Sequence, residues 1–392
     1  MANNEHERRI ERTPTDPDAP LRVVIAAGGT GGHLSPALAA LAALRERGPV
    51  DARWIGGTWG GERDAAARAG VPFVSIATGK LRRYFSWQTP LDLLRVPLGV
   101  AQAYRALGGW RPDVVFGTGG YVAVPTIIAA AWRGIPVLTH EQTAQIGLAN
   151  RIASRYADVL ALSFPVAPEG STVGKAQVIV TGNPVRQAIF GGDAAAGATH
   201  FGLAADLPTI YVTGGARGST PVNERVRDAL TALLPHVQVI HATGPSEANG
   251  DYPRLQAVRE GLPESLRRRY AVVEIVREEL RDVYALAQLV VGRSGAGTVA
   301  ELAALGKPSV LIPLPGTGGD EATKNARVLS DTGAALLRPQ AGVTGASLAK
   351  DVLALIGDPE GLARMGAAAR AVAPADAAGK LASAIIALAR RE

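Results

Sequence analysis

Short apolar runs rich in valine and isoleucine alternate along this chain with longer stretches rich in alanine and leucine. An apolar run of about four to eight residues is typical of a strand buried in a parallel sheet, and the longer stretches have the length of helices. The alternation occurs twice, each time opening with a strand that ends in a glycine-rich turn. The strand-like runs are residues 21–28, 113–121 and 136–141 in the first half and residues 208–215, 237–244, 289–295 and 308–314 in the second.

Strand-helix alternation of this kind predicts parallel sheets that are covered by helices on both faces. We therefore expect an α/β protein of two Rossmann-like domains, residues 21–182 and 201–373, whose sheets face a central cleft. A linker is expected at 183–200, where Pro184 and alanine- and glycine-rich residues interrupt the pattern. Residues 374–392 are predicted to form a helix that packs on either domain. Because ligands of open α/β sheets bind beyond the carboxyl ends of the strands, the site is expected between the domains.

Composition narrows the classes of function. The chain of 392 residues is 47% hydrophobic and 19% charged, which fits two globular domains. It has no cysteine, which excludes disulfides, thiolate nucleophiles and cysteine-ligated metals. The net charge of +6 fits an anionic partner, either nucleic acid or lipid, or an arginine-rich surface. Residues 1–20 are charged and contain prolines, so they predict a disordered tail and not a signal peptide. We find no uncharged apolar run of about 18 residues, so no membrane span is expected.

The first glycine-rich turn comprises Gly28, Gly29, Thr30, Gly31, Gly32 and His33. Free backbone N–H groups and the positive end of a helix dipole make such a turn a candidate anion site. The G-K-[ST] of a phosphate-binding P-loop is missing, and Leu34 occupies the place of the last small residue in the dinucleotide fingerprint. A tight turn with a structural histidine is the alternative interpretation.

Two turns in the second half have similar chemistry. In residues 292–308 a glycine-rich turn leads into a helix that carries Glu301. A fixed carboxylate there could accept both hydroxyls of a ribose, or could simply favour the helix dipole. In residues 213–220 the turn carries Arg217, whose permanent charge suits a phosphate.

The run His140–Glu141–Gln142 follows a predicted strand, where a charged and polar run is unlike core. A zinc-binding H-E-x-x-H motif would need histidine at position 144, which is alanine, so no metal site is expected. Residues 80–99 interleave aromatic and basic side chains, which suits an anionic membrane surface. An amphipathic helix packed on its own domain is the alternative for that stretch.

The motifs GGTGGH, GKLRRYFSW, GTGGY, HEQ, GNPVR, RSGAGTVAE and DEATKNA follow one another along the chain. In this order they resemble the peptidoglycan N-acetylglucosaminyltransferases of glycosyltransferase family 28, from about Leu21 to the C-terminus. The resemblance implies the GT-B fold and an inverting hexosyltransferase. Its substrates would be UDP-N-acetylglucosamine and undecaprenyl-linked muramyl-pentapeptide, and its product the lipid-linked disaccharide. It also implies a peripheral position on the anionic cytoplasmic face of the plasma membrane, no metal or other cofactor, and no nucleic acid partner.

The same resemblance implies roles for individual residues. His33 is the expected general base, because imidazole titrates near neutral pH. The first glycine turn and a second one, Gly119, Gly120 and Tyr121, would hold the acceptor diphosphate. Glu301 would bind the ribose, and the backbone at Arg277 the uracil. The expected donor residues are Thr30, Gly31, Gly32, Thr143, Arg186, Ala216, Arg217, Arg277, Ser294, Ala296, Gly297, Thr298, Val299, Ala300, Glu301, Glu321, Ala322 and Asn325. The expected membrane residues are Leu81, Arg82, Arg83, Tyr84, Phe85 and Trp87.

The chain departs from the family pattern at several of these positions. Thr143 replaces an asparagine, Ala216 a serine and Arg217 a glutamine. Ala322 replaces a glutamine expected to contact hydroxyls of the donor sugar, although Glu321 lies beside it. Three alternatives therefore stay open from the sequence: a related glycosyltransferase with another donor or acceptor, a nucleotide-sugar epimerase, and a non-catalytic nucleotide-sugar-binding homologue.

Overall fold

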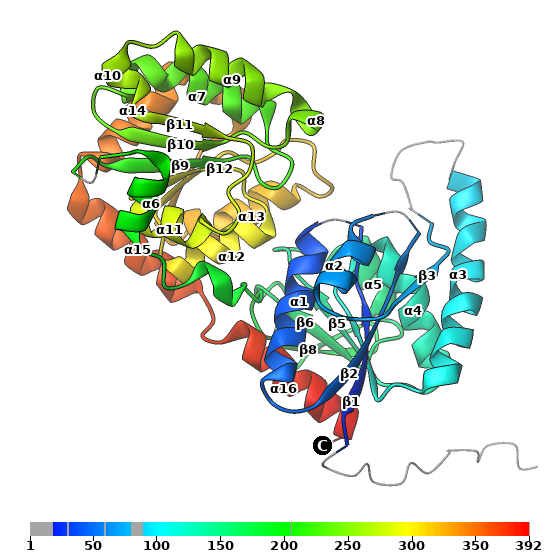
Figure 1. The fold of residues 1–392 in the computed structure, drawn as a ribbon. Helices are drawn as coiled ribbons and strands as arrows, with labels where there is room; N and C mark the ends of the chain where they lie inside the picture. The colour runs from blue at the N-terminus through cyan, green and yellow to red at the C-terminus, as the bar shows by residue number, and fades with distance from the viewer. Residues whose placement is uncertain (1–18, 30, 59, 80–88, 205, 392) are drawn as a thin grey trace, which may run out of the picture.

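The computed structural model describes residues 19–29, 31–58, 60–79, 89–204 and 206–391. These residues form two α/β domains, each built on one sheet (Figure 1). The predicted doubly wound architecture is confirmed: every strand pair in both sheets is parallel except the β7–β8 hairpin at the edge of the first.

The first domain has an eight-stranded sheet in the order β3-β2-β1-β4-β5-β6-β8-β7. Its strands are β1 (Leu21–Ala26), β2 (Val50–Gly57), β3 (Phe73–Ile76), β4 (Val114–Gly117), β5 (Val137–Glu141), β6 (Val159–Leu162), β7 (Thr172–Val173) and β8 (Ala176–Val180). Its helices are α1 (Gly31–Arg45), α2 (Glu62–Arg68), α3 (Thr89–Trp110), α4 (Gly120–Trp132) and α5 (Leu148–Ala153).

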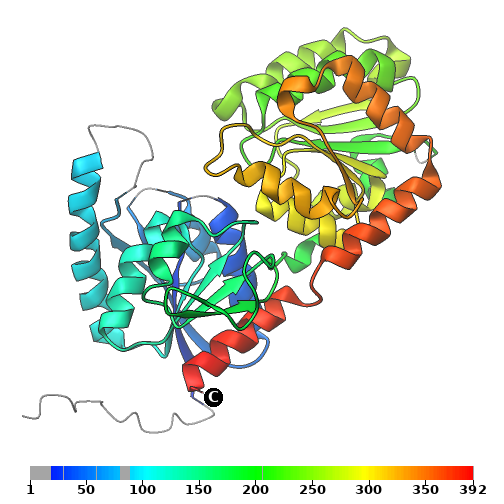
Figure 2. The ribbon, with the colours of Figure 1, turned by 180° about the vertical axis from the view of Figure 1, so that it is seen from behind.

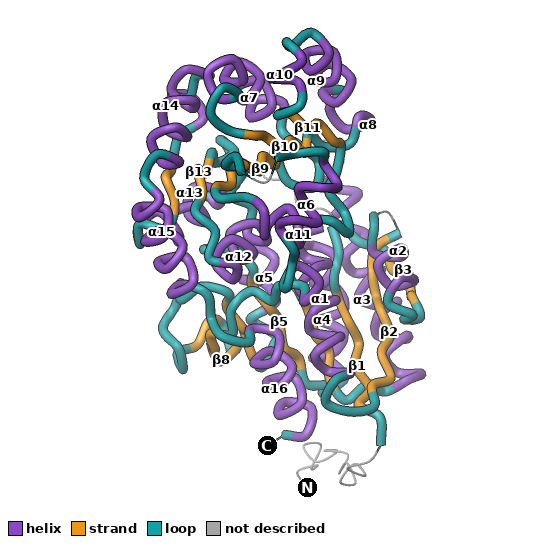
Figure 3. The backbone as a smooth tube through the Cα atoms, turned by 60° about the vertical axis from the view of Figure 1, so that its left-hand side comes forward, coloured by secondary structure: helices purple, strands orange, loops and turns teal. Residues whose placement is uncertain are grey.

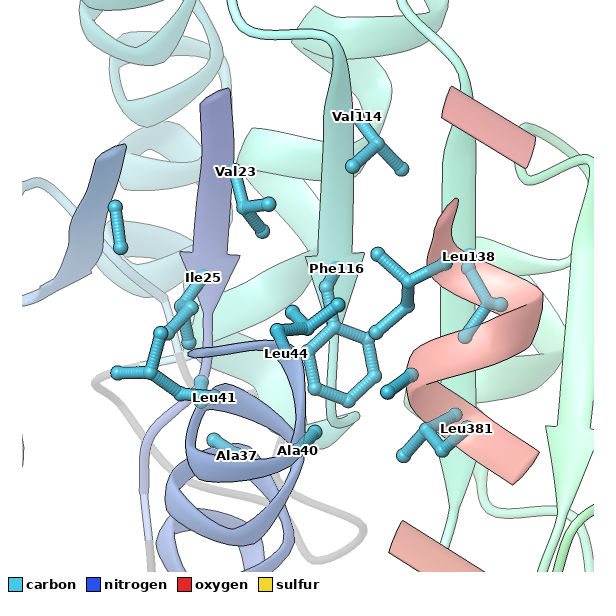
Figure 4. Close-up of a cluster of buried hydrophobic side chains, with 14 of the residues drawn as sticks. Val23, Ile25, Ala37, Ala40, Leu41, Leu44, Val114, Phe116, Leu138 and Leu381 are labelled. Atoms are coloured by element: carbon cyan, nitrogen blue, oxygen red, sulfur yellow. The ribbon is translucent and has the colours of Figure 1, made fainter. Parts of the chain in front are cut away.

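The side chains of each strand divide between two cores, because neighbouring residues of a strand point to opposite faces. In β1, Val23 and Ile25 pack with α1 and α2, whereas Val24 and Ala26 pack with α3, α4 and α5. Figure 4 shows the first of these cores, in which Leu381 from the C-terminal end of the chain lies close to Phe116 and Leu138.

The second domain has a six-stranded sheet in the order β11-β10-β9-β12-β13-β14. Its strands are β9 (Thr209–Thr213), β10 (Gln238–Ala242), β11 (Tyr270–Val273), β12 (Leu289–Gly292), β13 (Ser309–Leu311) and β14 (Ala335–Leu337). Its helices are α6 (Ala194–Phe201), α7 (Thr220–Leu233), α8 (Ser246–Asn249), α9 (Asp251–Glu260), α10 (Glu264–Arg267), α11 (Leu280–Leu286), α12 (Ala296–Leu305), α13 (Glu321–Ser330), α14 (Gly345–Ile356) and α15 (Pro359–Val372). Two short 3₁₀ helices, η1 (Gln187–Ile189) and η2 (Gln340–Gly342), complete it.

The segment expected as a linker, 183–200, contains a helix. Asp193 caps α6 by accepting the N–H of Ala195, and alanine favours the helix that follows. Helix α6 packs on α11 in the second domain. The connection between the domains is therefore shorter than the expected linker.

The chain crosses back to the first domain at its end. Helix α15 packs on α12, and after a break α16 (Ala377–Arg390) packs on α1 of the first domain, as Figure 2 shows in orange and red. By length and composition alone, Pro359–Arg390 is apolar enough to cross a membrane. In the structure it is two helices, and α16 contributes Leu381, Ala382 and Ile385 to the core of the first domain.

The strand order decides which turns meet between the domains. In the first sheet β1, β4 and β5 are neighbours, and in the second β9, β12 and β13 are. The turns after these strands therefore gather at one edge of each sheet. Helices α1 and α12, which follow two of those turns, contact each other where the domains meet (Figure 3).

Candidate active site

His33, in the first glycine turn, is held in place by hydrogen bonds with Thr118 in the neighbouring turn. His33 lies in the first turn of α1, and its Nδ1 is 2.8 Å from the carbonyl oxygen of Thr118, which follows β4. The hydroxyl of Thr118 donates in return to the carbonyl of His33 at 2.8 Å. A carbonyl accepts only, so Nδ1 carries the proton, and Nε2 is left with its lone pair. This tautomer is the one that a general base needs.

The second glycine turn packs directly against the first. Gly119 and Gly120 have φ values of 78° and 73°, a conformation that glycine adopts without strain. A Cβ added to Gly120 would lie 2.8 Å from the carbonyl oxygen of Gly28 and 3.4 Å from Nε2 of His33. A Cβ on Gly29 would lie 3.4 Å from the ring of Tyr121. The structure therefore brings these candidate acceptor residues together. Thr30 lies outside the described residues.

Glu62 is a candidate that the sequence analysis missed. Its carboxylate is fully buried, and Oε1 accepts the N–H of Gly29 at 2.8 Å. Its other oxygen has no hydrogen-bond partner in the part of the chain that the structure describes. A Cβ on Gly28 or Gly60 would overlap this carboxylate, so both glycines are needed for its approach. The only sequence signal was the glycine pair before Glu62, which marks a turn and not the direction of a side chain.

The loop after β5 is organised by the buried carboxylate of Glu141. Oε1 accepts both the N–H and the hydroxyl of Thr143, and Oε2 accepts the N–H of Gly147 and the amide of Asn150. In the same loop the Gln142 amide donates to the carbonyl of Thr118 at 2.6 Å, which is the carbonyl that positions His33. The Thr118 carbonyl therefore binds both His33 and the loop after β5.

Burial explains why the neighbouring histidine is not a competing base. His140 is fully buried, and this burial lowers its pKa to about 4, although a hydrogen bond to the Gly182 carbonyl opposes the shift. It stays neutral at physiological pH and points into the domain. We therefore assign it a structural role.

In the second domain Arg293 ties three turns together. Its guanidinium is buried and donates to the Ser219 hydroxyl, to the carbonyls of Ile312 and Pro313, and to the Gln340 amide. Ser294 adds a bond from its hydroxyl to the carbonyl of Ala322 at 2.7 Å. The turns after β9, β12 and β13 are thereby held at fixed relative positions. The first N–H groups of α12, at Ala296, Gly297 and Thr298, have no partner within the helix.

The candidate ribose ligand, Glu301, is fixed by its neighbours. The Tyr284 hydroxyl donates to Oε2 at 2.9 Å, and the Arg186 guanidinium lies 3.8 Å from Oε1. Burial raises the pKa of Glu301, whereas Tyr284 and Arg186 act in the opposite direction. Arg186 comes from the connection between the domains, so the sequence motifs GNPVR and RSGAGTVAE meet here.

Not every predicted donor residue presents a side chain at the interface. Val299 and Ala300 are buried, and Val299 belongs to the core beneath α12, so only backbone could serve a ligand there. Ala322 is also buried. Ala216, Arg217 and Arg277 are exposed on loops at the strand ends.

Helix α13 carries two predicted donor residues with polar side chains, Asn325 and Glu321. Asn325 is buried, and its Oδ1 accepts the N–H of Ala144 from the first domain at 2.8 Å. Glu321 lies at the start of the helix and is half-buried. Among the described residues, no cluster of three histidine, aspartate or glutamate side chains could hold a metal ion.

The predicted membrane residues Leu81, Arg82, Arg83, Tyr84, Phe85 and Trp87 lie outside the described residues. The helix that follows them, α3, exposes Leu98 and Tyr104, and the adjacent α4 exposes Trp132, whose side chain is 64% accessible. The Arg133 guanidinium stacks 3.7 Å from the centre of the Tyr104 ring. We call Leu98, Tyr104, Trp132 and Arg133 the α3–α4 face. Nothing in the sequence pattern distinguishes Trp132 from the apolar residues that precede it in the same helix.

Comparison with known proteins gives consistent matches over nearly the whole chain. The models of the glycosyltransferase family 28 N-terminal and C-terminal domains match residues 23–161 and 209–381. A protein of Nocardioides sp. named UDP-N-acetylglucosamine--N-acetylmuramyl-(pentapeptide) pyrophosphoryl-undecaprenol N-acetylglucosamine transferase is 40% identical over 378 residues, 94% of this chain and 98% of the relative. A Desulforudis audaxviator protein of the same name is 38% identical, covering 90% and 94%. The crystal structure of Acinetobacter baumannii MurG has a TM-score of 0.73 and 29% identity, covering 94% and 99%.

Proposed function

The chain belongs to glycosyltransferase family 28, and from that membership we propose that it transfers N-acetylglucosamine from UDP-N-acetylglucosamine to lipid-linked N-acetylmuramyl-pentapeptide. The acceptor's C4 hydroxyl attacks the anomeric carbon from the side opposite UDP, so the configuration inverts. The product is the lipid-linked disaccharide of peptidoglycan synthesis, which matches the activity in the names of the relatives.

One observation carries this proposal: the helix that begins at the His33 turn contacts the helix that carries Glu301. The candidate base for the acceptor and the candidate ligand of the donor nucleotide thus lie on facing elements of two domains. A transferase needs this arrangement, because its two substrates must meet with their reacting atoms aligned.

The residues then take the following roles. Nε2 of His33 removes the proton of the C4 hydroxyl as the new C–O bond forms, and the anomeric C–O bond to UDP breaks. The N–H groups at the start of α12 and the exposed Arg217 stabilise the charge that develops on the leaving diphosphate. Glu301 accepts the ribose hydroxyls, and Arg277 lies by the uracil. These groups supply the reaction's electrostatic needs without a metal ion, so we propose metal-independent transfer.

The acceptor is placed by the first domain. Its diphosphate lies against the turns at Gly28–Gly32 and Gly119–Tyr121, where the Glu62 carboxylate accepts the N–H of Gly29. Its lipid chain requires a membrane, and the α3–α4 face offers apolar side chains with an arginine beside them. We therefore place the enzyme peripherally on the cytoplasmic face of the plasma membrane.

A donor panel tests the proposal. Purified protein is mixed with a synthetic lipid-linked muramyl-pentapeptide diphosphate and one of several UDP-sugars, and UDP release and the lipid product are measured with and without a metal chelator. We expect transfer from UDP-N-acetylglucosamine alone, unaffected by the chelator, and loss of UDP binding in Glu301→Gln. Transfer of another sugar, or binding of UDP-N-acetylglucosamine without turnover, would contradict the proposed activity.

A further inference from the structure

A side chain of the first domain contacts the start of helix α13 in the second domain. The Gln145 amide donates to the carbonyl of Gly318 at 2.6 Å, and its oxygen accepts from the Lys324 ammonium at 3.0 Å. Gly318 precedes α13 and Lys324 lies in its first turns. Gln145 therefore spans the domain interface at the start of the helix that carries Glu321, Ala322 and Asn325.

Position 322 itself offers nothing polar to a sugar. The side chain of Ala322 is a buried methyl group, its N–H donates to the Thr317 hydroxyl, and its carbonyl accepts from Ser294. The carbonyl oxygen of the nearby Asn325 side chain already accepts from Ala144. Besides Glu321 on the same helix, a hydrogen-bonding group for the sugar can therefore come from another element.

We infer that Gln145 is a specificity-determining residue for the sugar of the nucleotide donor, contributed to the second domain's site by the first. This inference rests on the proposed function, since it presumes a UDP-sugar whose diphosphate lies at the turns after β9 and β12. The turn after β13 leads to α13 and is the next one along the sheet. A sugar that extends from the diphosphate toward this turn meets Gln145.

The Gln145 amide has the capacity for this contact. A primary amide has two N–H donors and an oxygen with two acceptor positions, and the contacts with Gly318 and Lys324 use one of each. One donor and one acceptor remain, which is the set that a sugar hydroxyl or an acetamido group needs. A contact with both would discriminate strongly against a sugar that lacks the matching group.

The position of Gln145 is fixed by the structure on both sides. The Thr143 hydroxyl oxygen lies 2.7 Å from the backbone carbonyl oxygen of Gln145 and 2.8 Å from Glu141 Oε1, so the backbone at Gln145 belongs to the ordered loop after β5. On the other side, a Cβ on Gly319 would lie 2.7 Å from Gln145 Oε1, so the amide packs against bare backbone. Such preorganisation lets one side chain contribute selectivity at a smaller cost in conformational entropy on binding.

Calorimetry with UDP and UDP-N-acetylglucosamine tests the inference, using the full chain, Gln145→Ala and the control Gln177→Ala. Gln177 is an exposed glutamine near the amino end of β8, away from the turns of the site. We expect Gln145→Ala to weaken binding of UDP-N-acetylglucosamine by about five- to tenfold, the loss of one neutral hydrogen bond or slightly more, and to leave UDP binding unchanged. The control should bind both ligands like the wild type.

The same variants are then assayed with the donor panel. Gln145→Ala should raise KM for UDP-N-acetylglucosamine more than it lowers kcat, and should narrow the preference over UDP-N-acetylgalactosamine. An equal loss for UDP and UDP-N-acetylglucosamine would show that Gln145 only holds the domains together, and unchanged binding of both would show that it does not contact the donor. Either result overturns the inference. The wild-type turnover separately decides the proposed function.

Discussion

At His33 the protein fixes one ring nitrogen and leaves the other for substrate. Nδ1 lies against the carbonyl of Thr118, and the Gln142 amide donates to that same carbonyl. Rotation of the ring would break a bond that the second glycine turn and the loop after β5 both support. The imidazole is therefore held in both tautomer and orientation, as a base requires.

Replacing His33 by alanine should remove the base and leave the fold intact. We expect kcat to fall by about 100- to 10,000-fold, with UDP binding unchanged, because the group acts on the acceptor hydroxyl. UDP release with the lipid acceptor and calorimetry with UDP measure the two quantities. His200→Ala, at an exposed histidine of α6, is the matched control. Near-normal turnover in His33→Ala would show that another group removes the proton.

Residue positions were predictable where a motif fixes both the residue type and its place on an element. His33 and Glu301 follow strands and begin or enter helices, so their location at the strand ends follows from the pattern. Glu62 was not predictable in this way. Its carboxylate turns inward beneath the glycine turn because Gly28 and Gly60 leave room for it, and that depends on contacts between turns after different strands.

At the scale of elements, α3 and α4 expose large apolar side chains that do not belong to a hydrophobic core. Leu98 and Trp132 are more than half accessible, while the inner faces of both helices pack in the second core of the first domain. Large apolar side chains on a surface with arginine nearby suit the headgroup region of an anionic membrane.

The double variant Leu98→Ser/Trp132→Ser should therefore bind membranes less. We expect its partition onto anionic vesicles to fall by about tenfold or more, because each side chain buries apolar area in the interface. Vesicle flotation measures the effect. Val166→Ser, at an exposed apolar residue of the same domain, should float like the wild type. Equal flotation of all three proteins would exclude this face as the contact.

The pattern predicted the existence and type of most elements but not all of their partners. The stretch 183–200 looked like a linker because alanine and glycine are common in both linkers and short helices, and only the Asp193 cap and the packing on α11 decide for the helix. For the last helix the sequence allows packing on either domain. By composition, its apolar residues Leu381, Ala382 and Ile385 could pack on either domain. In the structure they pack in the core between the first sheet and α1.

At the scale of the whole molecule, each domain buries one histidine in its sheet. Burial lowers the pKa of His140 to about 4 and that of His241 to about 3. His241 lies between the Tyr270 hydroxyl and the Asn223 amide, so it is satisfied as a neutral ring. In the unfolded chain both would titrate near pH 6.5. Below that pH the unfolded state binds more protons than the folded state, so stability rises with pH across this window.

Acidification should therefore destabilise the protein before its carboxylates titrate. Between pH 6.5 and 5, each buried histidine lowers the free energy of unfolding by about 2 kcal/mol. Urea unfolding of wild type and His241→Gln at pH 7 and 5 checks this: the variant should lose about 2 kcal/mol less than the wild type. His200→Gln, at an exposed position, should follow the wild type. Identical losses in all three would mean that His241 is protonated in the fold.

The chain passes between the domains at two places, near Gly182 and near Pro374, and these lie against each other: a Cβ on Gly182 would come within 2.6 Å of the proline ring. A single backbone cut at the first place would not free two separate bodies, because the downstream fragment still inserts α16 into the interior of the upstream one. If the gene were split at that boundary, the upstream product would lack α16 and expose the apolar residues that this helix covers. The downstream product would carry α16 with its apolar side exposed. The halves are interlocked partners and not modules that can be exchanged independently.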